Sequence, residues 1–211
     1  MTDILESMKQ TTREHLLRSA ALKEKVAEEC SAQVARCAQI LVETLRGGGK
    51  ILLCGNGGSA ADCQHIAAEF TSVLSKDFPR PGLAAIALTT DTSFITANAN
   101  DFGFDGIFER QVQALGRAGD AFIGISTSGH SPNVLRAAEY ARQNGIKTIA
   151  LTGAGGGAIG SISDAVVRIP SADTQLVQES HMSIGHVLCE LVERALFEKD
   201  SEERLPRSRR C

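Results

Sequence analysis

Residues 50–70 have the sequence KILLCGNGGSAADCQHIAAEF, which contains the pattern of a strand, a turn and a helix. The short apolar run over 50–55 ends in glycine and predicts a buried parallel strand. A glycine-rich turn then leads into an alanine-rich segment that we predict to be a helix over 59–74. A buried strand joined by a tight turn to a helix is the repeating unit of an α/β fold.

The same alternation of short apolar runs and helical segments continues to residue 197. The stretch 153–163, GAGGGAIGSIS, is predicted as a loop. Five strands separated by helices indicate an α/β fold, a doubly wound, flavodoxin-like sheet of five parallel strands with helices on both faces. The other strands are expected over 84–88, 121–126, 148–151 and 165–169, and the other helices over 91–97, 104–115, 131–144 and 174–197.

Two further segments flank this core. Residues 3–46 contain no glycine or proline and show helical periodicity, so two helices are expected there, with a break near residues 28–31. We assign 1–48 to an N-terminal helical extension of the same domain and 49–197 to the α/β domain proper. The tail, 198–211, is highly charged and contains a proline, which predicts disorder.

The composition excludes several classes of protein. A formal net charge of −3 argues against non-specific nucleic-acid binding. No apolar run approaches the ~20 residues that span a bilayer, and the N-terminus lacks a signal-peptide core. The six cysteines form no CxxC pair, which predicts reduced and mostly buried thiols. We therefore expect a cytoplasmic protein with no membrane or nucleic-acid partner.

Two strand ends carry loops that suit an anion, GNGGSA over 55–60 and STSGHSPN over 126–133. Ligands of open α/β sheets bind beyond the carboxyl ends of the strands, where glycines admit the anion, hydroxyls donate to it and helix N-termini point at it. Neither loop matches a nucleotide P-loop, and GNGGSA lacks the third glycine of a dinucleotide site. Each loop alone also suits an ordinary strand-to-helix turn. Together they indicate a sugar phosphate or a similar anion.

The predicted helix after the first loop carries His65 and Glu69, which share one helix face because they are four residues apart. Such a pair can bind a metal ion or transfer protons. The same spacing is also typical of a solvated ion pair.

The last predicted helix carries a second group of polar side chains on a mostly apolar background. His181 and His186 lie roughly 140° apart around the helix, so one face cannot present both. Gln178 and His186 lie roughly 80° apart and can border one site, and His186 is also close to the stripes of Glu179 and Glu190. Helical geometry does not choose among these arrangements.

Together, four motifs resemble those of the phosphoheptose isomerases, which belong to the sugar isomerase (SIS) domain superfamily. The resemblance extends over about residues 45–196 and, more loosely, over the N-terminal helices. It implies an isomerase that converts D-sedoheptulose 7-phosphate to D-glycero-D-manno-heptose 7-phosphate, the step that starts ADP- or GDP-heptose synthesis for lipopolysaccharide core or surface glycans. The four motifs are GNGGSAADCQHIAAEF, NANDFGFDGIFERQVQALGRAGD, GISTSGHSPNV and SADTQLVQESHMSIGHVLCELVE.

The resemblance also implies the site residues. One zinc ion per subunit would be held by His65, Glu69, Gln178 and His186, which places His186 rather than His181 in the site. Members of the family are homotetramers with sites at subunit interfaces, and the N-terminal helices would supply much of that interface. Substrate contacts are implied for Asn56, Gly57, Gly58, Ser59, Glu69, Asn100, Asp101 and Gln178, and phosphate contacts for Ser126, Thr127, Ser128 and Ser131.

The implied chemistry moves a proton between C1 and C2 of the sugar through an enediol, with Glu69 as base and His186 as acid. A zinc ion would polarise the substrate oxygens. A carboxylate bound to zinc is a weaker base, so Glu69 cannot fill both roles at full strength, and the zinc is either catalytic or structural. Position 130 is histidine where the family usually has asparagine. His130 either adds a pH-dependent charge beside the phosphate or is an exposed loop residue.

Two other functions fit the same superfamily. One is a non-catalytic scaffold that binds the replication initiator protein, but that relative lacks the catalytic glutamate and histidine that are present here as Glu69 and His186. The other is an SIS isomerase for a hexose or pentose phosphate. The resemblance of the acid–base pair and of the NDFG segment at 100–103 to the phosphoheptose isomerases implies the seven-carbon substrate.

Overall fold

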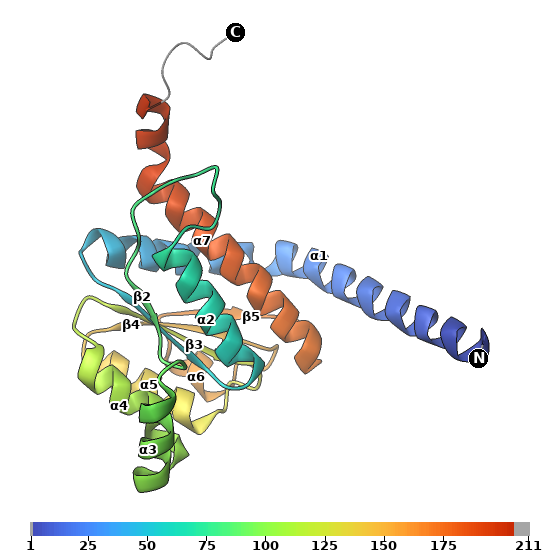
Figure 1. Cartoon of the computed structure of the whole chain (residues 1–211), viewed down its shortest axis with the longest axis horizontal. Coiled ribbons are helices and arrows are strands. Elements are labelled where there is room, and N and C mark those ends of the chain that lie inside the picture. The colour runs from blue at the N-terminus through green and yellow to red at the C-terminus, as the bar shows by residue number, and fades with distance from the viewer. Residues whose placement is uncertain (1, 205–211) are drawn as a thin grey trace.

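The computed structural model describes residues 2–204, and the side chains of residues 4–198. Its centre is one sheet of five parallel strands in the order β2-β1-β3-β4-β5 (Figure 1), which confirms the predicted fold class. The strands are β1 (Ile51–Gly55), β2 (Ala85–Ala87), β3 (Ala121–Ser126), β4 (Lys147–Thr152) and β5 (Ala165–Arg168).

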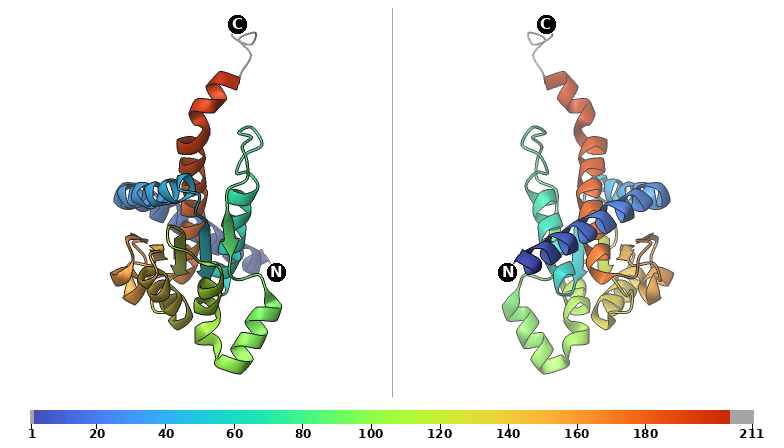
Figure 2. Two further views of the ribbon diagram at one scale, coloured as in Figure 1. Left: turned by 90° about the vertical axis from the view of Figure 1, so that its left-hand side faces the viewer. Right: turned by 90° about the vertical axis from the view of Figure 1, so that its right-hand side faces the viewer.

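Seven α-helices and one 3-10 turn surround the sheet in the described part of the chain. The long helices α1 and α7 lie on one side, and α1 projects well beyond the body of the molecule (Figures 1 and 2). The elements are α1 (Thr2–Arg46), α2 (Gly58–Thr71), α3 (Thr92–Phe102), η1 (Phe104–Gly106), α4 (Ile107–Leu115), α5 (Pro132–Gln143), α6 (Gly157–Ile162) and α7 (Thr174–Arg204).

The N-terminal segment is one continuous helix, so the break predicted near residues 28–31 is wrong. Ser31 does not interrupt the helix because its hydroxyl donates to the carbonyl of Ala27 one turn earlier. Cys30 is buried, and its thiol donates to the carbonyl of Arg168 at the end of β5, 3.3 Å away. The sheet therefore supports α1 at the point where we expected it to break.

Two other predicted boundaries also need correction. The stretch expected as a loop over 153–163 contains the short helix α6, whose Ile159 is buried and donates its backbone N–H to the carbonyl of Gly129. Helix α7 is described as far as Arg204, beyond the end expected at residue 197, and residues 198–204 contain no helix breaker; the disorder expected of the tail stays a prediction. The rest of the predicted tail, 205–211, lies outside the described residues.

Alternate residues of each strand point into two separate aliphatic cores. Ile51 and Leu53 of β1 face the side covered by α1, α2 and α7. Leu52 and Cys54 face the other side, which is covered by α4, α5 and α6. Both faces of the sheet are therefore dry, as the near-continuous apolar strands require.

The strand order creates a switch point between β1 and β3. These strands are neighbours, with Gly55 paired to Ile125, but the chain leaves β1 toward β2 and leaves β3 toward β4. The connections diverge at this point, so the loops after both strands border one crevice at the carboxyl edge of the sheet. The two loops that we predicted to bind an anion are these two.

In the described part of the chain, no helix has the length and apolarity needed to cross a membrane. The five cysteines among the described side chains are all free and buried, as the sequence predicted.

His181 of α7 belongs to the core rather than to a site. Its side chain is fully buried, and its Nε2 lies 3.1 Å from the carbonyl oxygen of Thr152. Burial lowers the pKa of His181 from 6.5 to about 4, because a charged imidazolium would lose its hydration there.

This burial predicts a pH-dependent stability. In the unfolded chain His181 is protonated as the pH falls below 6.5. In the folded chain it is not protonated until the pH reaches about 4. The stabilising contribution is therefore complete above pH 6.5 and is lost as the pH falls toward 4, by about 3 kcal/mol in all. Denaturant unfolding across this range should give a shallower pH dependence for His181→Asn than for the parent, whereas His130→Asn, in an exposed loop, should keep the parental slope. Equal slopes in all three proteins would contradict the assignment.

Candidate active site

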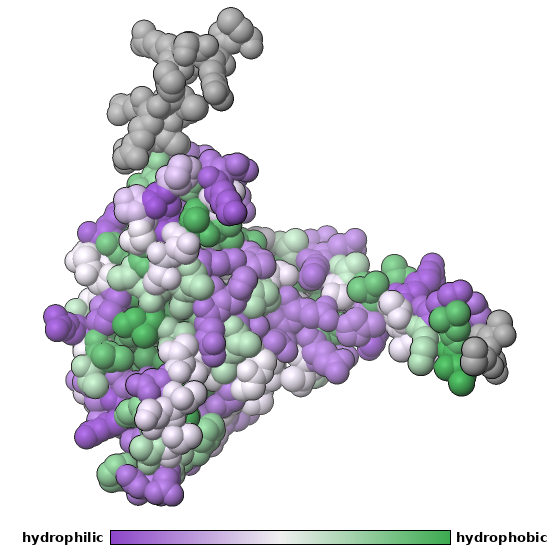
Figure 3. Space-filling view, viewed as in Figure 1, coloured by the Kyte–Doolittle hydropathy of each residue, from purple (hydrophilic) through white to green (hydrophobic). Residues whose placement is uncertain are grey.

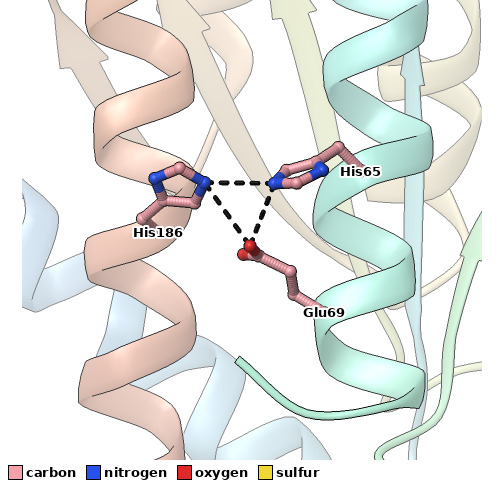
Figure 4. A group of neighbouring side chains, drawn as sticks. All are labelled: His65, Glu69 and His186. Carbon is pink, nitrogen blue, oxygen red and sulfur yellow. Dashed lines mark hydrogen bonds and ion pairs between the residues drawn. The ribbon is translucent and has the colours of Figure 1, made fainter. Parts of the chain in front are cut away.

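Helices α2 and α7 bring together three side chains that are distant in sequence. His65 and Glu69 project from one face of α2, and His186 projects toward them from α7 (Figure 4). The Nε2 atoms of His65 and His186 are 3.1 Å apart, and the Oε1 atom of Glu69 lies 2.9 Å from the first and 3.4 Å from the second. The two rings are half-exposed and the carboxylate is largely buried, so the cluster forms a shallow polar site with the carboxylate at its base.

Glycine allows the two helices to approach this closely. A Cβ at Gly185 would lie 2.6 Å from the Cδ1 atom of Ile66, and these residues are the chain neighbours of His186 and His65. A Cβ at Gly58 would come within 2.4 Å of the Gln178 amide nitrogen. The side chains of the site meet because each helix has a glycine, without a side chain, at one of these two contacts.

The cluster has the geometry of a divalent metal site. Tetrahedral zinc with ligand bonds of ~2.0–2.1 Å keeps neighbouring ligand atoms ~3.3 Å apart. The three ligand atoms here are separated by 2.9 to 3.4 Å, and two ring nitrogens facing each other need a proton or a cation between them. The second carboxylate oxygen of Glu69, Oε2, is buried and has no hydrogen-bond partner among the described residues. Imidazole and carboxylate donors at these distances fit zinc.

Gln178 approaches the same site at the start of α2. Its Nε2 donates to the Oδ1 atom of Asp62 over 3.3 Å, which leaves its carbonyl oxygen as the atom that can face a cation. We did not predict Asp62 as a site residue from the sequence, although it lies three residues before His65 and therefore on the same helix face. It is buried, and its Oδ2 atom has no partner among the described residues. Burial raises the pKa of Asp62, and the contacts with Gln178 and His65 partly oppose this shift.

The loop after β3 gathers hydroxyls at the N-terminus of α5. The Ser126 Oγ lies 2.9 Å from the Ser131 Oγ, and the backbone N–H groups of Gly129 and His130 donate to the hydroxyls of Ser126 and Ser128. Ser131 is the N-cap of α5 but makes no side-chain cap; Pro132 has no N–H and the Val134 N–H donates to the Oδ1 atom of Asn133, so the Asn133 N–H is the first-turn donor that can face a ligand. This arrangement suits a phosphate.

A reciprocal pair of amides joins this loop to the one after β1. Asn56 donates to Asn133 over 2.9 Å, and Asn133 donates to Asn56 over 2.8 Å. The predicted substrate contact Asn56 therefore also sets the distance between the loops, and Asn133 is a site residue that we did not predict. Gly57 has a φ of 56°, a conformation that favours glycine, and the buried Ser59 lies in the first turn of α2.

The structure does not bring every predicted residue to this crevice. Asn100 and Asp101 are exposed on α3, which has no buried residue, and the Asn100 amide donates to the Asp101 carboxylate over 2.8 Å. Apart from this bond between them, no hydrogen bond or ion pair joins either residue to a predicted site residue within the described part of the chain. Thr127 lies in the phosphate loop, where its carbonyl accepts from Gly153. Glu179 faces away from the site and binds His15 of α1 over 2.8 Å.

Comparison with known proteins gives a consistent result. A model of the SIS domain matches residues 14–153. The phosphoheptose isomerase of Chlorobaculum parvum is 54% identical over 181 residues, which cover 85% of this chain and 87% of that protein. The phosphoheptose isomerase of Trichlorobacter lovleyi is 55% identical over 177 residues, covering 84% of this chain and 89% of the relative.

Solved structures agree with the sequence relatives. The phosphoheptose isomerase from Neisseria gonorrhoeae superposes with a TM-score of 0.83 at 41% identity, covering 88% of this chain and 98% of its own. The one from Francisella tularensis gives the same TM-score of 0.83 at 38% identity. Domain model, sequence and fold agree over most of the chain, which belongs to the phosphoheptose isomerase family of SIS-domain enzymes.

Proposed function

We propose that this enzyme converts D-sedoheptulose 7-phosphate to D-glycero-D-manno-heptose 7-phosphate, the first step of nucleotide-activated heptose synthesis. One observation carries the proposal: α2, which follows β1, presents His65 and Glu69 to His186, and the hydroxyl-lined loop follows β3, the neighbour of β1 at the switch point. A sugar phosphate has two ends of different chemistry, and the crevice offers a matching partner for each. The relatives named phosphoheptose isomerase support the seven-carbon substrate.

The phosphate end would bind the loop after β3. Hydroxyls and the backbone N–H of Asn133 would donate to phosphate oxygens, and the positive end of the α5 dipole would stabilise their charge. The four hydroxyl-bearing residues are Ser126, Thr127, Ser128 and Ser131. The glycine turn at 56–58 would let the backbone approach the sugar chain.

The reacting end would lie between α2 and α7. Glu69 would take the proton from one sugar carbon, and His186, on the opposite helix, would exchange a proton with the substrate oxygen. The two carboxylate oxygens of Glu69 have different surroundings, because Oε1 faces the ring nitrogens and Oε2 has no partner among the described residues. One oxygen can therefore contact a cation while the other keeps a lone pair for the proton. Such a division would allow Glu69 to serve in both proposed roles.

We also propose that His65, Glu69, Gln178 and His186 hold one zinc ion per subunit, which when bound would polarise the carbonyl and hydroxyl oxygens of the substrate. The ligand spacing and the free carbonyl oxygen of Gln178 support this set. The five free, buried cysteines support a reducing compartment, and we propose the cytoplasm.

We propose a homotetramer in which a neighbouring subunit completes each site. Helix α1 exposes a row of large apolar side chains along its projecting part (Figure 3). Helix α3 projects from the lower end of the molecule in Figure 1, has no buried residue, and carries the exposed Asn100 and Asp101. A second copy would cover these surfaces. The apolar side chains of α1 are Ile4, Leu5, Met8, Leu16 and Leu17, each between 53% and 62% exposed.

The proposed reaction predicts the behaviour of two variants. Glu69→Gln and His186→Gln should lower kcat on sedoheptulose 7-phosphate by roughly 10²- to 10⁴-fold, because each removes one proton-transfer group. Glu190→Gln, one turn from His186 and paired with the exposed Arg194, should keep parental activity. Product formation should be followed on a panel of pentose, hexose and heptose ketose phosphates. Preference for a shorter sugar would contradict the seven-carbon substrate, and no turnover on any of them would favour the scaffold function.

Metal removal gives an independent prediction. Dialysis against a chelator should abolish turnover, and added zinc should restore it. His65→Ala should bind zinc at least about 10-fold more weakly in equilibrium dialysis, whereas His130→Ala should bind it as the parent does. Full activity of protein shown to be metal-free would rule out an essential zinc ion.

The proposed assembly can be tested by light scattering. Leu16→Glu should reduce the measured mass below that of a tetramer, because a charge would be buried at the interface. Thr11→Glu provides a control on the same helix, roughly 140° around from Leu16. A monomeric parent protein would contradict the proposal.

A further inference from the structure

The connection from α2 to β2 carries an arginine with no exposed side-chain surface. This segment runs alongside α7 (Figures 1 and 2), and the Arg80 side chain is 0% exposed. A guanidinium group keeps its charge under all ordinary conditions, so it can be buried only where its donors are paired.

The charge of Arg80 is balanced by a single carboxylate on α7. The Oε1 atom of Glu193, whose side chain is 4% exposed, lies 2.8 Å from Arg80 Nε and 2.5 Å from Nη2. The same oxygen also accepts the backbone N–H of Leu74 over 3.1 Å. Arg80 thereby fixes the connecting segment to α7.

The remaining donors of Arg80 bind the end of α2. Nη2 donates to the carbonyl of Glu69 over 2.7 Å, and Nη1 donates to the carbonyls of Phe70 and Ser72 over 2.8 and 2.9 Å. The last carbonyls of a helix have no partner within the helix, and a positive charge there interacts favourably with the negative end of the helix dipole. Arg80 is thus the cap of α2, and the turn that it caps carries Glu69.

Glu193 lies on the α7 stripe that faces the site. It follows His186 by seven residues, which is close to two full turns, so both side chains leave the helix in nearly the same direction. Cys189, one turn after His186, is buried between them, and burial and the nearby Glu69 carboxylate raise the pKa of its thiol. The Arg80–Glu193 pair therefore connects the backbone of Glu69 to the helix face of His186.

We propose that Arg80 is a positioning residue for the isomerase reaction. Together with Glu193 it holds the last turn of α2 at a fixed distance from α7, and this sets the separation of Glu69 from His186. The inference rests on the proposed function, because it assigns the purpose of the buried pair to the proton-transfer cluster. Lysine cannot replace Arg80, because a single ammonium group cannot reach the three carbonyls and the carboxylate together.

The test compares this pair with a second largely buried ion pair that lies far from the site. Lys50 and Asp120 are 2.5 Å apart at the start of β1 and β3, at the opposite edge of the sheet from the crevice.

Arg80→Lys and Glu193→Gln should lower kcat by roughly 100-fold, because small displacements of catalytic groups reduce the rate by about that factor. They should change KM by less than about 3-fold, because the loop after β3 is unchanged. Zinc affinity should fall by about 10- to 100-fold. Asp120→Asn should lower the thermal midpoint while leaving kcat, KM and zinc affinity at parental values.

A readout that needs neither substrate nor metal separates this inference from the proposed function. In the metal-free protein, the ring-proton NMR signals of His65 and His186 should shift in Glu193→Gln and stay in place in Asp120→Asn. This result would support the positioning role even if the parent isomerised none of the sugar phosphates. Loss of thermal stability in Glu193→Gln with unchanged ring signals, kcat and zinc affinity would overturn it and reduce Arg80 to a structural cap.

Discussion

The close packing of α2 against α7 is the constraint on which the site depends. Gly185 leaves room for Ile66, and Gly58 leaves room for Gln178, so the helices meet at two places where one of them has no side chain. The residues next to these contacts are His186 and His65, and the distance between their ring nitrogens follows from the helix separation. Helix packing is a dense, low-compressibility contact, so it can hold ligand atoms to within a few tenths of an ångström.

The buried polar groups near the site differ in whether other protein groups satisfy their hydrogen bonds. Buried polar atoms nearly always have a hydrogen-bond partner, and unpaired ones call for an explanation. Two of the four unpartnered buried atoms among the described side chains belong to Asp62 and Glu69, at the cluster. The Arg80–Glu193 pair next to them is fully used by protein contacts. The inner part of the site is therefore rigid and the outer part is prepared for a ligand.

The two halves of the crevice are held by different means. The phosphate loop is positioned by backbone hydrogen bonds to the glycine-rich stretch after β4, from Gly153 to Thr127 and from Ile159 to Gly129. Gly129 and Gly157 approach so closely that a Cβ on either would lie within 2.5 Å of the other segment. The His65–Glu69–His186 cluster depends on side chains from two helices.

The sequence alone determined the features that depend on residues close together in the chain. Strand patterns, the two ligand loops, and the His65–Glu69 spacing are local, and the α/β fold followed from their alternation. Local pattern was wrong about the break in α1 and about α6, because contacts with β5 and with Gly129 stabilise helix at those points.

Tertiary structure decided which distant residues meet. Helical geometry left several polar positions of α7 open, and packing then placed His181 in the core, Glu179 against α1 and His186 beside His65. Asp62, Asn133 and Arg80 acquire their roles through side-chain partners 77 to 116 residues away, namely Gln178, Asn56 and Glu193. Periodicity fixes directions within one element, whereas distances between elements depend on how their side chains fill the space between them.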